Sequence, residues 1–276
     1  MANPELTVLI PVYNGARYLA KAIESVLLQS FRDFELLILD DGSTDETPQI
    51  MADYAAKDGR IRTLHHANQG VGYTLGRGLR AARGDYIAEL GADDIALPER
   101  FKQQLLFLKR NRDHVMVGGY LDIIDENDAV IGRREYPVNK LHILNTLPIA
   151  NPFASPSLMY IRMVALDAGS YTSRFKSCED YDFVLRLALR GAVANLPFVL
   201  TAYRMHPDAE KARNTVRQLR ETLSIKCAAY SEYGYPETGR ARIINLAQRL
   251  LALAPPGLVY ALFKALAIRR YRKIRP

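Results

Sequence analysis

The chain has 276 residues, of which 49% are hydrophobic and 24% charged, as in a globular protein with one large domain or one domain plus an appendage. Two cysteines without metal-ligand spacing exclude a disulfide framework. The net charge is +7, but residues 264–276 hold six basic residues and no acid, which leaves +1 for residues 1–263. A nearly neutral body excludes the basic surface expected of a nucleic-acid-binding protein.

The first third of the chain alternates between apolar strands and amphipathic helices. We expect four strands, at residues 6–12, 34–39, 61–65 and 85–90. We expect three helices between them, at about residues 18–30, 43–57 and 72–83. The second helix is expected to begin at Ser43-Thr44-Asp45-Glu46, which has the form of a capping box. This alternation predicts a doubly wound, mostly parallel α/β sheet flanked by helices.

Polar residues follow three of these strands. The segments are Tyr13-Asn14, Asp40-Asp41 and Asp93-Asp94. Right-handed crossovers place the carboxyl ends of parallel strands at one edge of the sheet, where ligands bind. Neighbouring carboxylates there suit Mg²⁺ or Mn²⁺, which bind one or two acids plus substrate phosphates. The alternative for Asp93-Asp94 is an exposed acidic turn, but the convergence of three strand ends favours the metal.

The first turn argues against a dinucleotide-binding enzyme. It reads Pro-Val-Tyr-Asn-Gly-Ala-Arg, without the G-x-G-x-x-G pattern, and no Walker-type motif occurs in the chain. The pairs Gly70-x-Gly72 and Gly76-x-Gly78 follow the third strand, which is the wrong place. Phosphates would then be held by something other than a glycine cradle, and a divalent cation is the natural substitute.

The second half contains further strands and a second acidic pair. We expect a helix from Pro98, strands at 115–124, 129–132, 157–161 and 199–203, and irregular chain at 137–155. Glu179-Asp180 opens a helix in which Asp182 can pair with Arg186. By position alone, acids at this helix end offset the macrodipole. A single histidine such as His206 is more often structural than a ligand.

The carboxyl-terminal part is expected to be helical. The predicted helices are at about 210–232, 238–254 and 257–274, with Pro255-Pro256 as a break. The last one combines apolar residues with a dense basic end, which suits a helix lying on an anionic membrane surface, although an ordinary packing helix is the alternative. A short polar start and the absence of a long apolar run predict neither a signal peptide nor a spanning helix. We therefore expect a cytoplasmic protein, peripheral on the membrane.

Together these motifs resemble family 2 glycosyltransferases with the GT-A fold. The resemblance rests on segments that occur in the family's order: Val8 to Gly15, Ser25 to Phe31, Leu39 to Asp45, Asn68-x-Gly70, Gly84 to Ile87, Ala92 to Asp94, Pro156-Ser157, Glu179 to Leu187 and Tyr203-Arg-x-His206. It implies a catalytic domain at 1–206, with a nucleotide-binding half at 1–96 and an acceptor half at 97–206. Residues 207–276 would form a helical extension.

The resemblance also implies roles for single residues. The implied nucleotide-binding set is Pro11, Val12, Tyr13, Asn14, Asp40, Asp41, Gly70, Arg77 and Asp93. Asp93, Asp94 and His206 are the implied ligands of Mn²⁺ or Mg²⁺, which would stabilise the leaving nucleoside diphosphate. Asp180 is similar to the general base of inverting members, supported by Glu179, and would take the proton of the acceptor hydroxyl.

The expected reaction is transfer of a sugar from a nucleotide-sugar, with a UDP-sugar favoured, to a glycan or lipid-linked acceptor in bacterial polysaccharide or glycolipid synthesis. Two residues depart from the family pattern. Gly91 replaces an acid, and Leu75 replaces an arginine for which Arg77 could substitute. These departures keep open a non-catalytic module that binds a nucleotide or glycan. A nucleotidyltransferase, which would release pyrophosphate from a nucleoside triphosphate, is a further alternative.

Overall fold

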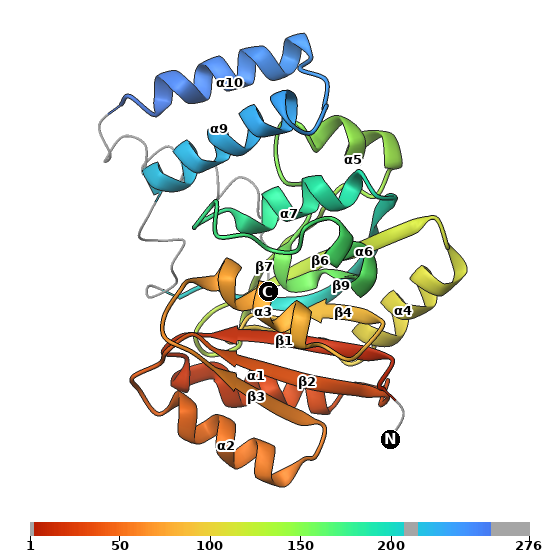
Figure 1. Cartoon of the computed structure of the whole chain (residues 1–276), viewed down its shortest axis with the longest axis vertical. Helices are drawn as coiled ribbons and strands as arrows, with labels where there is room; N and C mark the ends of the chain where they lie inside the picture. The colour runs from red at the N-terminus through yellow and green to blue at the C-terminus, as the bar shows by residue number, and fades with distance from the viewer. Residues whose placement is uncertain (1–2, 207–214, 255–276) are drawn as a thin grey trace.

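The computed structural model describes residues 3–206 and 215–254, and its centre is a twisted mixed sheet (Figure 1). The strands are β1 Leu6–Val12, β2 Phe34–Asp40, β3 Ile61–His65, β4 Tyr86–Glu89, β5 Ile95–Ala96, β6 His114–Ile124, β7 Val130–Arg134, β8 Met159–Ile161 and β9 Ala192–Arg204. They lie in the order β3-β2-β1-β4-β8-β6-β9-β5, and β7 pairs with β6. Strands β1 to β4 are mutually parallel, as are β6 and β9, whereas β8 is antiparallel to β4 and β6.

The helices cover both faces of this sheet. They are α1 Ala16–Leu27, α2 Thr47–Lys57, α3 Val71–Ala81, α4 Arg100–Arg110, α5 Lys140–Thr146, α6 Arg162–Asp167, α7 Glu179–Ala188, α9 Thr215–Ser231 and α10 Gly239–Leu251. Val8 and Ile10 of β1 pack with residues of α1, α2 and α4, whereas Leu9 between them packs with residues of α3 and α7. Because β1 is buried on both faces, its sequence is a continuous apolar run rather than an alternating one.

The helix α9 belongs to the same core. Its residues Ile225 and Ala229 are buried in the cluster that contains Leu185 of α7. Beyond α9, the hydroxyl of Tyr235 donates a hydrogen bond to the carbonyl of Leu185 (2.8 Å). The fold therefore matches the predicted GT-A-like sheet with helices following it. The predicted helix at 257–274 and the predicted beginning of the helix at 210–232 lie outside the described residues.

Several predicted local features were wrong. Ser43 does not form a capping box, because α2 begins at Thr47 without a side-chain cap and the Ser43 hydroxyl instead accepts from the Asn14 N–H (2.8 Å). The stretch 137–155, predicted to be irregular, contains α5. The structure adds α6 and β5, which were not predicted, and α4 begins at Arg100 rather than Pro98. Strand β9 begins seven residues earlier than expected, at Ala192 rather than 199.

Candidate active site

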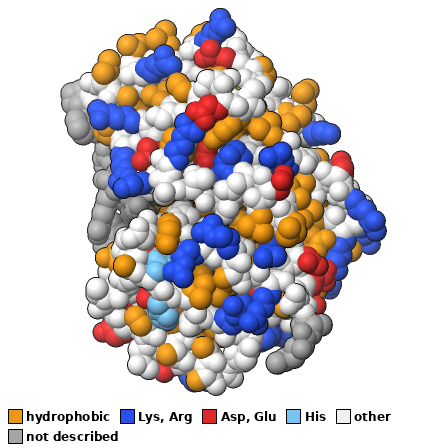
Figure 2. Space-filling model, in the orientation of Figure 1, with side chains coloured by type: hydrophobic (Ala, Val, Ile, Leu, Met, Phe, Trp, Pro, Cys, Tyr) orange, Lys and Arg blue, Asp and Glu red, His pale blue; other side chains and the backbone are white. Residues whose placement is uncertain are grey.

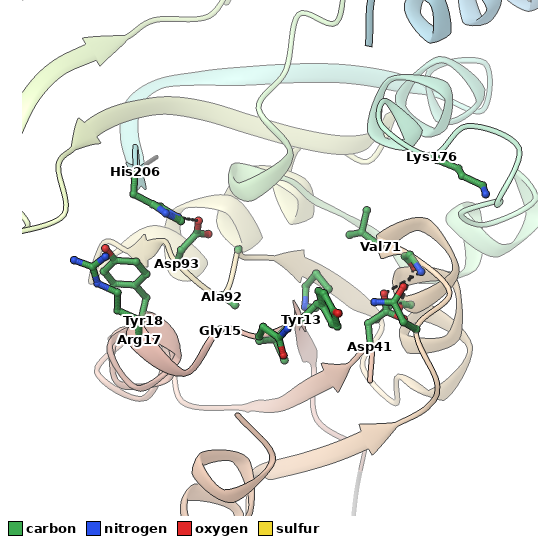
Figure 3. Close-up of a pocket in the computed structure, with 17 residues that line it drawn as sticks. Tyr13, Gly15, Arg17, Tyr18, Asp41, Val71, Ala92, Asp93, Lys176 and His206 are labelled. Atoms are coloured by element: carbon green, nitrogen blue, oxygen red, sulfur yellow. Dashed lines mark hydrogen bonds and ion pairs between the residues drawn. The ribbon is translucent and has the colours of Figure 1, made fainter. Parts of the chain in front are cut away.

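A cavity of about 730 Å³ opens at the carboxyl edge of β1, β2 and β4 (Figure 3). Its size is within the usual range for a ligand-binding cavity. Eight of the predicted site residues line it: Pro11, Val12, Tyr13, Asn14, Asp41, Gly70, Asp93 and His206. The remaining predicted residues do not line this cavity: Asp40, Arg77, Asp94, Glu179 and Asp180. The strand ends therefore meet as expected. Only Asp41 of the pair Asp40-Asp41 and only Asp93 of the pair Asp93-Asp94 line the cavity.

Asp41 fixes one end of the cavity. Its carboxylate accepts hydrogen bonds from the backbone N–H groups of Gln69 (2.8 Å) and Gly70 (2.9 Å), so it holds the loop before α3 against β2. Gly70 has a φ of 89°, a conformation that glycine adopts without strain. Asp40 is buried and accepts from the N–H of Ser43 (2.9 Å), and it therefore shapes the adjacent turn rather than the cavity wall.

Asp93 and His206 meet at the other end (Figure 3). The Oδ2 atom of Asp93 is 3.0 Å from Nε2 of His206, and the Asp93 side chain is 36% exposed. The His206 ring lies beside the ring of Tyr18, with 5.2 Å between centroids, and Arg17 stacks on the same tyrosine at 4.9 Å. Arg17 and Tyr18, which sequence reasoning missed, thus border the end of the cavity that contains Asp93.

Asp93 and His206 fit a divalent cation only in part. No group of three or more His, Cys, Asp or Glu side chains in the described part of the chain could hold a metal by itself. One carboxylate and one imidazole are nevertheless suitable partial ligands for Mn²⁺ or Mg²⁺ when substrate phosphates and water complete the shell. The Nδ1 atom of His206 is buried without a hydrogen-bond partner among the described residues. If His206 bound the cation through Nε2, its Nδ1 atom would keep its present surroundings.

Asp94 does not line the cavity. It is 2% exposed, and its Oδ1 accepts a hydrogen bond from the backbone N–H of Arg204 (2.9 Å). Arg204 is itself buried: its guanidinium donates to the carbonyls of Asp93 and Asp125 (both 2.8 Å) and pairs with Asp128 (2.6 Å). This cluster joins the turn after β4 to the end of β9. The hydrogen bond from the Arg204 N–H gives Asp94 a structural role, and its role as a metal ligand stays a prediction.

The two departures from the family pattern have different surroundings. A side-chain carbon placed on Gly91 would lie 2.6 Å from Oδ2 of Asp94 and 2.9 Å from Oδ1 of Asp93, so the two carboxylates fold over this glycine. Leu75 is buried in the core. Arg77 does not line the cavity, whereas Lys176, from the loop before α7, does. The sequence carried no distinctive signal for this lysine, because it stands outside the recognised motifs.

A second, smaller pocket of about 150 Å³ contains Asp180. The carboxylate of Asp180 accepts a hydrogen bond from the side-chain amide of Asn151 (3.2 Å). Tyr136 and Phe153 supply aromatic walls to this pocket, and Arg134 adds a positive charge. Glu179, the preceding residue, instead packs its aliphatic part against Gly72 of α3. Glu179 and Asp180 therefore have different surroundings. Asn151, which contacts Asp180, is a further site residue that sequence reasoning missed.

Glu89 lies buried beside the second pocket. Its Oε1 accepts hydrogen bonds from the hydroxyls of Tyr160 and Tyr171 (both 2.7 Å), and its Oε2 accepts from Ser155 (3.2 Å), which lines that pocket. The pKa of Glu89 is raised to about 7, chiefly by burial and to a small extent by the charge of Asp180, against the opposing effect of the three hydrogen bonds. The chain thus holds a titratable carboxyl group near Asp180.

Solved structures of low sequence identity share this fold. One is *Staphylococcus aureus* TarS 1–349 in complex with UDP-GlcNAc, with a TM-score of 0.69, 21% identity, and coverage of 90% of this chain and 72% of that one. Another is the mannosyltransferase PcManGT from *Pyrobaculum calidifontis* in complex with GDP-Man and Mn²⁺, with a TM-score of 0.66, 15% identity, and coverage of 99% and 82%. At these identities the likeness shows the fold alone.

Sequence relatives are more closely similar. The chain is 32% identical over 224 residues to the putative glycosyltransferase EpsE of *Bacillus subtilis*, covering 77% of each protein. It is 30% identical over 230 residues to the O-antigen biosynthesis glycosyltransferase WbnJ of *Escherichia coli*, covering 82% of this chain and 87% of that one. It spans 32% of the length of a longer uncharacterized glycosyltransferase from *Rickettsia felis*. The family model described as glycosyl transferase family 2 matches residues 7–169, and the chain belongs to that family.

Proposed function

We propose that this chain transfers a sugar from a nucleotide-sugar to an acceptor hydroxyl, with inversion at the anomeric carbon. The observation that carries the proposal is the division of the site into two pockets. Asp41 and Asp93 stand at the two ends of the larger one, and Asp180 stands in the smaller one. A direct displacement suits such a division, because the acceptor hydroxyl attacks the anomeric carbon of the donor on the face opposite the leaving diphosphate.

In this proposal the larger cavity binds the donor. Its length from Asp41 to Asp93 suits a nucleoside diphosphate, with the base beside Asp41 and the phosphates near Asp93 and His206 (Figure 3). A bound Mn²⁺ or Mg²⁺ would neutralise charge on the leaving diphosphate. Asp93 and His206 would hold it, without the contribution from Asp94 that we expected. Lys176 adds a positive charge to the same cavity. A UDP-sugar is the donor that we favour.

Asp180 would act as the general base in the smaller pocket. The Asn151 amide donates to its carboxylate, and such a bond keeps the group oriented while it accepts the proton of the acceptor hydroxyl. The aromatic walls and polar groups of this pocket suit a sugar ring, so the acceptor we propose is a glycan or a lipid-linked glycan in bacterial polysaccharide or glycolipid synthesis. We propose contact of residues 257–276 with an anionic membrane surface as a second part of this function.

The test is release of nucleoside diphosphate from UDP-, GDP- and dTDP-sugars with Mn²⁺ and a lipid extract as the acceptor source. We would compare the wild type with Asp93→Asn and Asp180→Asn, using Asp53→Asn on the exposed side of α2 as the control. Asp94→Asn is a less direct test because Asp94 is 2% exposed and does not line the larger cavity.

We expect release from one donor, retained in Asp53→Asn and lost in the other two variants. Metal-dependent binding of UDP without release, with every donor and acceptor tried, would contradict the proposal in favour of a non-catalytic module. Pyrophosphate release from a nucleoside triphosphate would identify a nucleotidyltransferase instead.

A further inference from the structure

The helix α10 presents an apolar stripe to solvent. Ile243, Leu246, Leu250 and Leu253, the last of which follows the helix, are 72, 60, 62 and 83% exposed. Their spacing of three and four residues places them on one side of the helix, at about 100° per residue. Four large apolar side chains this exposed on one short segment mark a surface for interaction rather than ordinary scatter.

The opposite side of α10 attaches the helix to the protein. Ala241 and Asn245 are buried, and the Gln248 side chain accepts a hydrogen bond from the buried Lys226 of α9 (2.6 Å). The helix is capped by the Thr238 side chain, which accepts from the N–H of Ala241. The fold of α10 therefore does not depend on the exposed stripe, and substitutions in the stripe leave these contacts intact.

Positive charge lies on both sides of the stripe. The helix α10 carries Arg240, Arg242 and Arg249 and no acidic residue. At about 100° per residue, Arg240 falls on one side of the stripe and the other two arginines on the opposite side. Figure 2 shows hydrophobic and basic side chains gathered over the end of the molecule where α10 lies. The sequence beyond the described residues continues this pattern, with six basic residues at 264–276.

We propose that α10 lies on the surface of an anionic lipid bilayer, with its apolar stripe among the acyl chains and its arginines at the headgroups. An apolar stripe flanked by basic residues without acids is the pattern of interfacial helices. A second copy of the chain fits this surface poorly, because α10 has three arginines and no acid, and among the described residues only Arg242 has an acidic partner nearby, Glu237 (3.5 Å), so stripe-to-stripe contact would bring like charges together. The inference is independent of sugar transfer.

The experiment is co-sedimentation of the full chain with vesicles of phosphatidylcholine and phosphatidylglycerol, and with vesicles of phosphatidylcholine alone. The stripe variant is Leu246→Gln with Leu250→Gln, since glutamine retains helix propensity. The matched control is Leu28→Gln with Leu141→Gln, two leucines that are 70 and 66% exposed elsewhere on the surface. A third variant, Leu262→Gln with Leu266→Gln, alters the tail. Sedimentation velocity without lipid reports self-association.

We expect the wild type and the control to bind the anionic vesicles and not the neutral ones. The stripe variant should bind about 100-fold more weakly, at about tenfold for each leucine. Arg240→Gln with Arg242→Gln should weaken binding about 25-fold, at about fivefold for each charge. Three results would overturn the proposal: no binding by the wild type, equal binding by wild type and stripe variant with loss only in the tail variant, or a wild-type dimer that the stripe variant dissociates.

Discussion

We expect Glu89→Gln to stabilise the protein at alkaline pH and to change little in acid. Glu89 is 3% exposed and accepts hydrogen bonds from Tyr160, Tyr171 and Ser155. Desolvation by burial, the largest effect, raises its pKa to about 7. Glutamine has the same shape without the charge. Its oxygen can accept from both tyrosines and its amide can donate to the Ser155 hydroxyl, so the three contacts are preserved.

The sign of the effect follows from proton linkage. The folded state holds the Glu89 proton more tightly than the unfolded chain, because its folded pKa of about 7 lies above the ordinary value of 4.5. The contribution to stability is complete below pH 4.5 and is lost as the pH rises through about 7. One unit of pKa corresponds to about 1.4 kcal/mol, so the full loss is on the order of 3 kcal/mol. The glutamine variant has no such proton to lose.

Urea unfolding of both proteins at pH values from about 5 to about 8 measures this difference. The free energy of unfolding of the variant should exceed that of the wild type by an amount that grows with pH. Glu232→Gln is the control, because this exposed carboxylate pairs with Arg174 and the pairing lowers its pKa. That control should keep the Glu89-dependent fall in stability with pH. A stability difference between the Glu89 variant and the wild type that is constant across the range would refute the reasoning.

Three further substitutions test packing and the acidic turn. Gly78→Ala places a carbon 2.4 Å from Cδ1 of Leu39 and should cost about 1–3 kcal/mol in urea unfolding, and a cost near zero would contradict the packing. Gly91→Asp should destabilise the fold more than Gly91→Asn, because the added carboxylate would lie close to that of Asp94. Titration calorimetry should show no gain in Mn²⁺ affinity for Gly91→Asp, and tighter Mn²⁺ binding would refute this prediction. Arg204→Met removes the buried guanidinium from the carbonyls of Asp93 and Asp125 and from its ion pair with Asp128, and should cost about 3–5 kcal/mol, so an unchanged melting temperature would count against the cluster.

The first four strands and the sheet edge at which their ends meet were predictable because they depend on local pattern and on the topology of parallel sheets. Continuous apolar runs such as 6–12 identified strands buried on both faces, and parallel pairing then fixed the edge at which their ends meet. The sequence could not decide which member of each acidic pair faces the cavity. Asp93 contacts His206 and Asp94 contacts the backbone of Arg204, both more than 100 residues further along the chain, and no local pattern encodes either contact.

The same limit explains the error at Ser43. Local spacing predicted that its hydroxyl would cap α2, but a backbone N–H of the loop after β1 competes for that oxygen. Thr47 and Asp45 make the same kind of contact, accepting from the N–H groups of Gly15 (2.9 Å) and Ala16 (3.1 Å). Three side chains at the start of α2 thus satisfy backbone donors of the loop after β1, which would otherwise need water.

These cross-links give the donor cavity a preformed wall. The loop after β1 is held by side chains from the start of α2, and the loop before α3 is held by Asp41 from the end of β2. A ligand entering the cavity meets backbone already fixed by hydrogen bonds, so less conformational entropy is lost on binding. Asp41, which the sequence predicts as a binding residue, therefore holds the protein's own backbone. Its substitution should weaken binding even if its carboxylate does not touch the ligand.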